Sequence, residues 1–349
     1  MSQSPAKLNL TELTNSLMEA LDERSRDIIK RRFAIKTDEV ETLESIGKEY
    51  GITRERVRQI ESQGKKILMN LEQSLQPVTD AFKEIFVING GLLADDHIVA
   101  LSRQTFGSIL SAAHVYLYLE ILPGYKHISR DTTFGPHWRH QDVNSAQAVA
   151  VAEAAADILK QEKHPVVEEK LLEQIIVTLK ATSETLPKAQ LKTYLIASKH
   201  VGKTPFGEWG LSNWSETSPR GVGDKAYAVL RRHNKPEHFT HITDLINQAS
   251  FDHKQANPQT VHNELIKDGR FVLVGRGLYG LAEWGYIPGT VADVLESLLK
   301  RTNDGLTRDE LIEQVLEQRQ VKKNTILLGL QNEKRFLKTP ENRYVLRQK

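Results

Sequence analysis

Polar side chains that can form specific hydrogen bonds recur along one short amphipathic stretch, residues 54–66. If this stretch is helical, one face near its start presents Arg54, Glu55, Arg58 and Gln59. Arg pairs with guanine and Gln with adenine through two hydrogen bonds each, and Glu accepts from cytosine. Such a face can therefore read base edges in the major groove. A solvated amphipathic helix would show the same periodicity and charge, and the pattern alone leaves this alternative open.

Basic side chains near this face could hold the DNA backbone. From residue 54 to residue 66 five basic residues stand against two acidic ones. Lysines about two turns beyond the base-reading residues are too far along the helix to follow the bases and are better placed for phosphates. We predict phosphate contacts from Thr53, Arg56, Lys65 and Lys66.

Two helices and a tight turn are needed to present this face. Thr42 is the N-cap candidate of a first helix, and Thr53 is that of the second. Between them Gly51 supplies the positive φ that a sharp turn often needs. The apolar positions at helical spacing are Leu43, Ile46, Tyr50, Val57, Ile60, Gly64, Leu68 and Leu71. The pattern predicts a helix-turn-helix.

With the upstream segment Glu23–Ile35, this pair of helices resembles region 4 of bacterial housekeeping sigma factors. The resemblance covers roughly residues 12–72 and is densest in Thr53–Glu61, which reads TRERVRQIE. It implies that the second helix enters the major groove of the upstream (minus thirty-five) promoter hexamer. One departure is Gly64, where the family usually has Ala; we expect it to loosen the helix by roughly 0.5–1 kcal/mol.

The resemblance also implies roles for single residues. Positions matching Arg54, Glu55 and Gln59 contact bases in that family, and the position of Arg58 lies close to DNA and to activators. The partners it implies are double-stranded DNA and RNA polymerase.

Composition limits the other classes of function. The chain has 349 residues, a formal net charge of +2 and no cysteine, so a nucleic-acid surface must be a local patch and no Cys-ligated metal is expected. The most apolar run, Val115–Leu122, is too short for a membrane span and is interrupted by Glu120. The N-terminus lacks a signal-peptide core. We expect a cytoplasmic, nucleoid-associated protein with no membrane partner, no cofactor and no small-molecule substrate.

The second half of the chain repeats itself with a shift of 65 positions. Arg270-Phe271 falls on Arg335-Phe336, and Tyr279 falls on Tyr344. In both copies a first helix, a third helix and a closing hairpin share this period, which indicates two copies of one winged-helix unit. The first copy resembles a HARE-type winged helix, as in the RNA polymerase delta subunit, on the stretch 268–281. That resemblance implies association with DNA or transcription machinery.

The last copy is rich in basic residues. From residue 318 to residue 349, nine Lys or Arg residues stand against two Glu residues. We predict that Lys322, Lys323 and Arg343 contact phosphates, although an ordinary solvated surface fits the same composition.

The fold class predicted is mostly α, a helix-turn-helix followed by tandem winged-helix modules with short two-stranded wings. Several helices followed by a glycine- and aromatic-containing hairpin predict two further modules before the repeat. The predicted boundaries are residues 10–76 for the helix-turn-helix, 77–145 and 146–214 for two winged helices, 215–223 for a linker, 224–286 for the HARE-type module and 288–349 for the basic module.

Two possible reaction centres are set aside. Glu168-Glu169-Lys170 has the Glu-x-Lys spacing of metal-dependent nucleases, with Asp157 upstream, but it lies in a helical pattern where those sites need a strand. His137 and His140 around Trp138 lack a third ligand and read as a histidine pair in a wing or loop. We therefore expect neither an enzyme nor a metal site.

The function predicted is a sequence-specific DNA-binding transcription factor that recognises a promoter-like element and works with or against RNA polymerase holoenzyme. A complete sigma factor is not expected, because nothing resembles the region that binds core polymerase and melts the downstream hexamer. The alternative is an adaptor whose winged helices dock polymerase or another protein. A restriction-like nuclease component is a remote third possibility.

Overall fold

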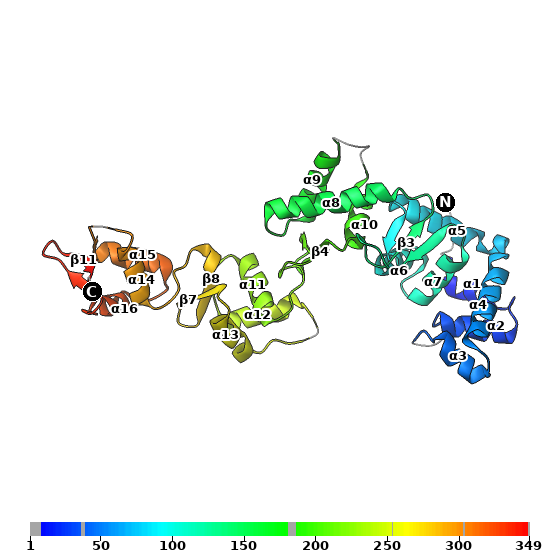
Figure 1. Cartoon of the computed structure of the whole chain (residues 1–349), viewed down its shortest axis with the longest axis horizontal. Helices are drawn as coiled ribbons and strands as arrows, with labels where there is room; N and C mark the ends of the chain where they lie inside the picture. The colour runs from blue at the N-terminus through cyan, green and yellow to red at the C-terminus, as the bar shows by residue number, and fades with distance from the viewer. Residues whose placement is uncertain (1–7, 36–38, 181–185, 253, 303, 348–349) are drawn as a thin grey trace, which may run out of the picture. The chain divides into compact units, whose positions relative to one another are not determined.

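Helices make up most of the chain, and the sheets formed by the described residues are small and antiparallel (Figure 1). The computed structural model describes residues 8–35, 39–180, 186–252, 254–302 and 304–347. Two compact units are present, Met1–Gly202 and Lys203–Lys349. The predicted fold class, a helix-turn-helix with winged-helix modules, is confirmed. No helix among the described residues is long and apolar enough to cross a membrane.

The first unit begins with four helices: α1 (Leu10–Met18), α2 (Glu23–Arg32), α3 (Leu43–Tyr50) and α4 (Arg54–Met69). The helices α3 and α4 are the two predicted from the apolar spacing. Together with α2 they enclose a small core of Ile28, Ile46, Val57 and Ile60. Leu71 of the predicted stripe lies just beyond α4 and is only partly buried.

Three helices and three strands follow: α5 (Glu72–Ile88), β1 (Leu92–Ala94), α6 (Asp95–Phe106), α7 (Ala112–Ile121), β2 (Tyr125–Ile128) and β3 (His137–His140). The sheet order is β1-β3-β2, an arrangement consistent with a winged helix. The boundary predicted between residues 76 and 77 is wrong, because α5 runs through Pro77. Pro77 lies in the second turn of this helix, where it removes one backbone hydrogen bond and does not end the helix.

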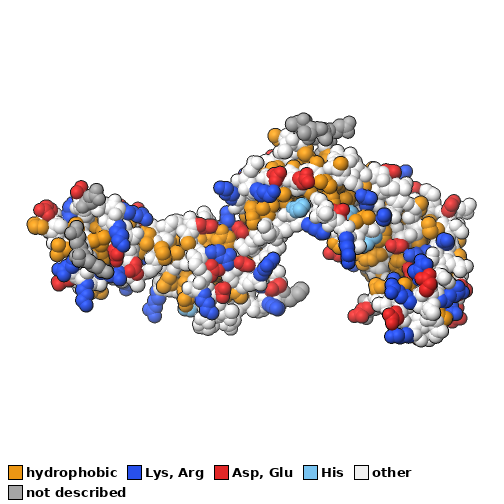
Figure 2. Space-filling model, in the orientation of Figure 1, with side chains coloured by type: hydrophobic (Ala, Val, Ile, Leu, Met, Phe, Trp, Pro, Cys, Tyr) orange, Lys and Arg blue, Asp and Glu red, His pale blue; other side chains and the backbone are white. Residues whose placement is uncertain are grey.

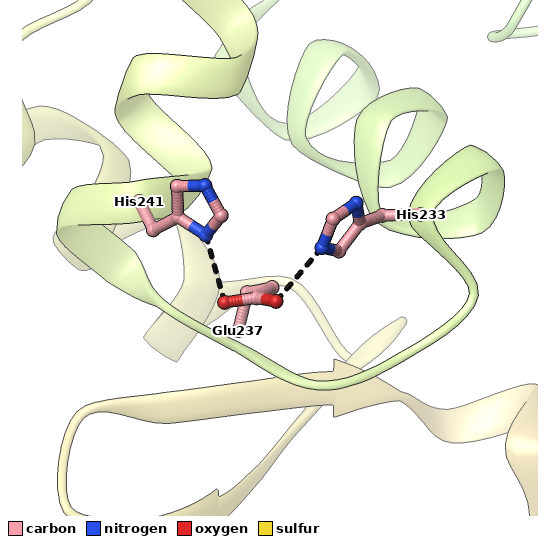
Figure 3. A group of neighbouring side chains, drawn as sticks. All are labelled: His233, Glu237 and His241. Carbon is pink, nitrogen blue, oxygen red and sulfur yellow. Dashed lines mark hydrogen bonds and ion pairs between the residues drawn. The ribbon is translucent and has the colours of Figure 1, made fainter.

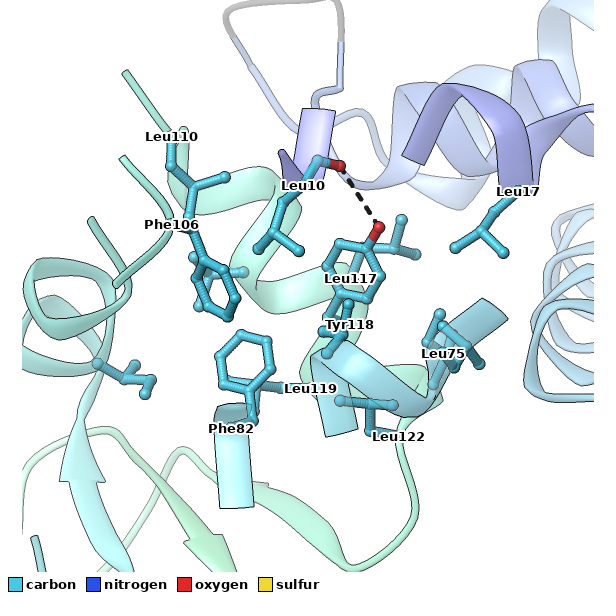
Figure 4. Close-up of a cluster of buried hydrophobic side chains, with 14 of the residues drawn as sticks. Leu10, Leu17, Leu75, Phe82, Phe106, Leu110, Leu117, Tyr118, Leu119 and Leu122 are labelled. Carbon is cyan, nitrogen blue, oxygen red and sulfur yellow. Dashed lines mark hydrogen bonds between the residues drawn. The ribbon is translucent and has the colours of Figure 1, made fainter. Parts of the chain in front are cut away.

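The helix-turn-helix and these elements share one core (Figure 4). Leu10 and Leu17 of α1 pack with Phe82 of α5 and Tyr118 of α7. The hydroxyl of Thr14 also donates to the hydroxyl oxygen of the buried Tyr118 at 3.1 Å. Residues predicted as two separate modules therefore form one packed body.

The segment predicted as a second winged helix contains α8 (Ser145–Glu162), α9 (Glu168–Lys180), α10 (Lys188–Ala197) and the paired strands β4 (Val201–Lys203) and β5 (Trp209–Leu211). Its predicted end at residue 214 does not coincide with the division between the units, because the second unit already begins at Lys203. Its third helix, α10, packs against β1 of the preceding module. The Tyr194 hydroxyl donates to the carbonyl oxygen of Gly90 at 2.8 Å, and the amide of Gly135 donates to the carbonyl oxygen of Ala197 at 2.9 Å. The outer surface of α10 therefore packs against other residues of the first unit.

The second unit contains the two predicted copies. The first consists of α11 (Val222–His233), β6 (Glu237–His238), α12 (Phe239–Ala249), α13 (Pro258–Lys267), β7 (Phe271–Gly275), β8 (Leu278–Leu281) and a 3-10 turn, Ala282–Trp284. The second consists of α14 (Val291–Leu299), β9 (Leu306–Thr307), α15 (Arg308–Gln318), α16 (Lys323–Leu330), β10 (Phe336–Lys338) and β11 (Arg343–Leu346). Each wing has a third, two-residue strand, β6 or β9, that the sequence analysis missed because so short a strand shows no alternation.

The two copies have separate apolar cores, as the repeat predicted. Phe271, Tyr279 and Phe336 are buried at the wings, whereas Tyr344 is only partly buried. The helices α13 and α16 begin 65 residues apart, but α11 and α14, like α12 and α15, begin 69 residues apart. The loop before the third helix is shorter in the second copy, so only the third helix and the wing keep the 65-residue period. The prediction that the first helix shares it is wrong as to where that helix begins.

The predicted linker, residues 215–223, is irregular only up to residue 221, because α11 already begins at Val222. Glu216 is buried and accepts a hydrogen bond from the Arg231 guanidinium at 2.8 Å. Composition identified a loop but could not show that an ion pair fastens it to α11.

Candidate nucleic-acid interface

The turn between α3 and α4 is held by caps and by a close backbone approach. The side chain of Thr42 accepts from the Ser45 amide at 3.1 Å, and that of Thr53 accepts from the Arg56 amide at 3.2 Å. Gly51 takes the left-handed conformation, with φ 63° and ψ 33°. All three positions are as the sequence analysis predicted.

A second glycine, Gly47, makes the tight packing of this turn possible. The amide of Ile52 donates to the carbonyl oxygen of Gly47 at 2.9 Å. A Cβ atom on Gly47 would lie 2.7 Å from the carbonyl oxygen of Ile52, which is too close for two non-bonded atoms. The start of α4 is therefore placed by backbone contacts, and its first residues project from a rigid turn.

The four residues predicted to read bases lie on the exposed surface of α4: Arg54, Glu55, Arg58 and Gln59. Arg58 donates to both carboxylate oxygens of Glu55, at 2.9 Å and 2.7 Å, and this pairing lowers the pKa of the Glu55 carboxyl. Arg56 donates to the Gln59 side-chain oxygen at 3.1 Å. The Arg54 side chain makes no hydrogen bond or ion pair with any residue that the structure describes. The Arg54 side chain can contact a base directly, whereas Arg58 must first break its hydrogen bonds to the Glu55 carboxylate.

The two lysines further along α4 have different surroundings. The Lys65 ammonium lies 3.3 Å from Glu61 Oε1 and 3.3 Å from Glu120 Oε2, and its side chain is only 24% exposed. Two carboxylates already neutralise it, so its contacts do not support the predicted role in holding phosphate. Lys66 is exposed on the same side of the helix as Gln59. It remains a candidate for phosphate contact, together with the exposed Thr53 and Arg56.

Charged side chains crowd the surface formed by α2, α3 and α4 (Figure 2). Lys and Arg alternate there with Asp and Glu, as the Glu55–Arg58 pair illustrates. Within the part of the chain that the structure describes, this surface is therefore patterned and not uniformly positive. Such a surface favours recognition by hydrogen bonds over attraction by bulk charge.

The basic C-terminal module offers a second candidate surface. Lys322 and Lys323 are exposed at the start of α16 and form no ion pair with any described residue. Arg343 lies on β11, where its Nη1 atom is 3.4 Å from the Gly305 carbonyl oxygen and 3.8 Å from Glu310 Oε2. The two lysines can reach phosphates directly, whereas Arg343 also contacts its own module.

The third helices of the modules differ in what covers them. The helix α7 is largely buried, since it packs against α1 and α4, and α10 packs against β1. By contrast, α13 exposes Gln259 and Asn263, and α16 exposes its first residues. A helix covered by its own chain cannot enter a DNA groove. Among the candidate recognition helices in the described part of the chain, α4, α13 and α16 are left available.

The residues considered as two possible reaction centres lie on helix surfaces and in a wing. Glu168 starts α9 as a helical residue and pairs with Lys192 at 2.9 Å, and Asp157 pairs with Lys160 at 2.8 Å. His137 and His140 both lie on β3, a wing strand. The predicted position of this histidine pair, in a wing, is thus confirmed.

A different cluster was missed. His233, Glu237 and His241 come together between α11 and α12, with their ligand atoms all within 4.8 Å of one another. The regular spacing of four residues was visible in the sequence. It was not recognised because the three residues span a helix end, a strand and a second helix, and periodicity within one element does not reveal such a group.

Residues 17–68 match the family described as Sigma-70, region 4. This segment is a sigma-70 region 4 domain. It contains the helix-turn-helix and all of the residues on α4 up to Lys66, so the predicted resemblance is confirmed there. The resemblance of residues 224–282 to a HARE-type winged helix stays a prediction.

Curated relatives match over the same region. RNA polymerase sigma factor SigA of Lactococcus lactis subsp. cremoris is 34% identical over 74 residues, 21% of this chain and 20% of the relative. RNA polymerase principal sigma factor HrdD of Streptomyces viridifaciens is 46% identical over 59 residues, 17% of this chain and 18% of the relative. RNA polymerase sigma factor RpoD of Helicobacter pylori is 52% identical over 54 residues, 15% of this chain and 8% of the relative. The chain spans a fifth or less of the length of these relatives.

Proposed function

We propose that this chain is a DNA-binding transcription factor that reads a promoter-like element through α4. The observation that supports this most directly is the exposed face near the start of α4, within a sigma-70 region 4 domain. On this face the Arg54 side chain is unengaged and Gln59 lies one and a half turns further on. Arg and Gln at these positions can each discriminate between bases by about 1–3 kcal/mol. The protein acts with or against RNA polymerase holoenzyme, on the nucleoid, and not as a complete sigma factor.

The modules after the region 4 domain extend this interaction along the DNA. In this proposal the HARE-like module and the basic C-terminal module contribute α13 and α16, and Lys322 and Lys323 contact phosphates without reading sequence. The helices α7 and α10 take no part, because they are covered within the first unit. The proposal includes no catalytic step.

The test compares two duplexes, one selected by the full chain from random DNA and one scrambled, at several salt concentrations. Arg54→Ala should weaken the selected duplex by about 1–3 kcal/mol and relax preference at one or two base pairs. Lys66→Ala should weaken both duplexes about equally and reduce the slope of log affinity against log salt by about 0.9. Lys65→Ala is the matched control, since Glu61 and Glu120 already neutralise that side chain, and it should leave the slope unchanged.

Equal weakening of both duplexes by Arg54→Ala would mean that α4 does not read sequence. A second candidate function, a protein-docking adaptor, would then be preferred. It is supported by the way α7 and α10 use their third-helix surfaces for packing against protein. In that case the full chain should bind purified RNA polymerase holoenzyme equally well with and without the Arg54→Ala substitution.

A further inference from the structure

Two histidines and a glutamate converge at the junction of three elements in the second unit (Figure 3). His233 is the last residue of α11, Glu237 is the first residue of β6, and His241 lies in the first turn of α12. Asn234 takes the left-handed conformation, with φ 56°, and turns the chain back after α11. The turn brings the three side chains to one place although each belongs to a different element.

The carboxylate of Glu237 lies between the two imidazole rings. His233 Nε2 is 2.8 Å from Glu237 Oε1, and His241 Nδ1 is 2.8 Å from Glu237 Oε2. Burial raises the pKa of Glu237, but hydrogen bonds from His241, Lys235 and His233 outweigh it and lower this pKa to about 2. A carboxylate that binds a metal must be ionised, as a glutamate ordinarily is at neutral pH.

We propose that His233, Glu237 and His241 bind a divalent transition-metal ion of the zinc class. Two imidazole nitrogens and one carboxylate oxygen form a donor set typical of Zn²⁺, which binds such atoms at about 2.0–2.2 Å. Ligand atoms around a tetrahedral ion at that distance lie roughly 3.3 Å apart. The three ligand atoms already lie within 4.8 Å of one another. Closing the site requires rotation of these partly exposed side chains and removal of the protons that the two imidazole nitrogens donate to Glu237, either by release or by transfer to the other ring nitrogen.

The donor set also indicates which ions should be rejected. Mg²⁺ and Ca²⁺ prefer oxygen ligands, and this cluster offers two nitrogens. Three protein ligands leave a fourth tetrahedral position for water. The site should therefore select Zn²⁺ or Co²⁺ over Mg²⁺.

One neighbouring cation competes for the same carboxylate. Lys235 Nζ lies 3.0 Å from Glu237 Oε1, and the Lys235 side chain is 63% exposed. Because that side chain can swing into solvent, a metal ion can displace it. This competition provides a sensitive test, since removing the lysine should strengthen metal binding without touching a ligand.

A bound ion would join the end of α11, the start of α12 and the wing. The wing is included because Glu237 pairs with Tyr279 across β6 and β8. None of the three ligands belongs to α13, so the ion would leave the exposed face of that helix free. The measurable consequence is greater stability, because an ion bound only by the folded module stabilises it by mass action. This inference does not depend on the proposed function.

The experiment uses the full chain freed of metal by a chelator and titrated with Zn²⁺, with Mg²⁺ as the control ion. We expect saturable binding of Zn²⁺ and a higher melting temperature of the second unit, with no effect of Mg²⁺. Substituting Co²⁺ should give the visible absorption of a tetrahedral site. His241→Gln and Glu237→Gln should each weaken Zn²⁺ binding at least about tenfold, since even residues that only support a metal ligand contribute 10–100-fold.

Two further variants keep the test decisive. His200→Gln removes an exposed histidine outside the cluster and should leave the affinity for Zn²⁺ unchanged. Lys235→Ala keeps all three ligands and should tighten binding several-fold. If His200→Gln and His241→Gln bind Zn²⁺ equally well, or if Lys235→Ala shows no gain, the cluster is only a hydrogen-bonded network that ties two helices to the strand, and the proposal is wrong.

Discussion

The approach of α3 to α4 predicts that Gly47→Ala weakens the helix-turn-helix. A Cβ atom at this position would lie 2.7 Å from the Ile52 carbonyl oxygen and 3.5 Å from the Arg54 nitrogen. The first of these is a fixed backbone atom, because the Ile52 amide donates to the Gly47 carbonyl oxygen within the same turn. To relieve the contact, the start of α4 must move away from α3.

The magnitude follows from two opposing contributions. Gly→Ala in a helix interior gains about 0.8–1 kcal/mol of intrinsic helix propensity. Overpacking of a tight site costs typically about 1–3 kcal/mol. We expect a net loss of about 1 kcal/mol, and up to about 2 kcal/mol, together with weaker DNA binding because Arg54 and Gln59 start from a displaced helix.

Gly64→Ala is the matched control, since it makes the same chemical change in the same domain. There the added Cβ atom meets Ile29 Cδ1 at 2.7 Å, the far end of a flexible side chain. Moving Ile29 away from its preferred rotamer costs of order 0.5–1.5 kcal/mol, which roughly offsets the gain in helix propensity. Gly64→Ala should therefore be close to neutral.

Native-state hydrogen exchange of the full chain, followed by mass spectrometry, measures both variants. It reports the opening free energy of the amides in α3 and α4 separately from the other modules, which a single melting curve of a chain with several modules does not. If Gly47→Ala proves as stable as Gly64→Ala, the Gly47–Ile52 contact does not determine the packing of the turn, and the reasoning fails.

Three further predictions follow from contacts elsewhere. Thr53→Ala removes the cap on the Arg56 amide and should lower the opening free energy of the first turn of α4 by about 1 kcal/mol in the same exchange experiment, whereas Thr53→Ser should retain most of it. Tyr118→Phe removes the hydrogen bond between the Thr14 and Tyr118 hydroxyls, while Thr14 keeps its bond to the Leu10 carbonyl oxygen at 2.6 Å, so the first unit should lose about 0.5–1.5 kcal/mol in urea denaturation; no change would mean that this hydrogen bond contributes nothing. Since the pKa of Glu237 is lowered to about 2 from 4.5, its stabilisation of the second unit should be present above about pH 4.5 and be lost as the pH falls towards 2, and Glu237→Gln should remove this part of the acid sensitivity.

The sequence by itself determined the elements whose causes are local. Caps act over three residues, apolar stripes repeat every three or four, and a left-handed turn needs a glycine at one position. For this reason the roles of Thr42, Gly51 and Thr53 followed from their immediate neighbours in the chain, as did the face that includes Arg54. The repeat was visible for the same reason, because its third helix and wing keep one spacing.

Only the tertiary structure decided which of these surfaces remain available. Lys65 and Lys66 are adjacent in the sequence and equal in charge, yet Glu120, which neutralises Lys65, belongs to a helix 55 residues away. In the same way the burial of α7 depends on α1, and the cluster at Glu237 depends on a turn that joins three elements. Contacts between distant segments leave no periodic trace in a single sequence, because each partner satisfies only its own local pattern. Packing therefore determined which of the predicted residues can meet a partner outside the chain.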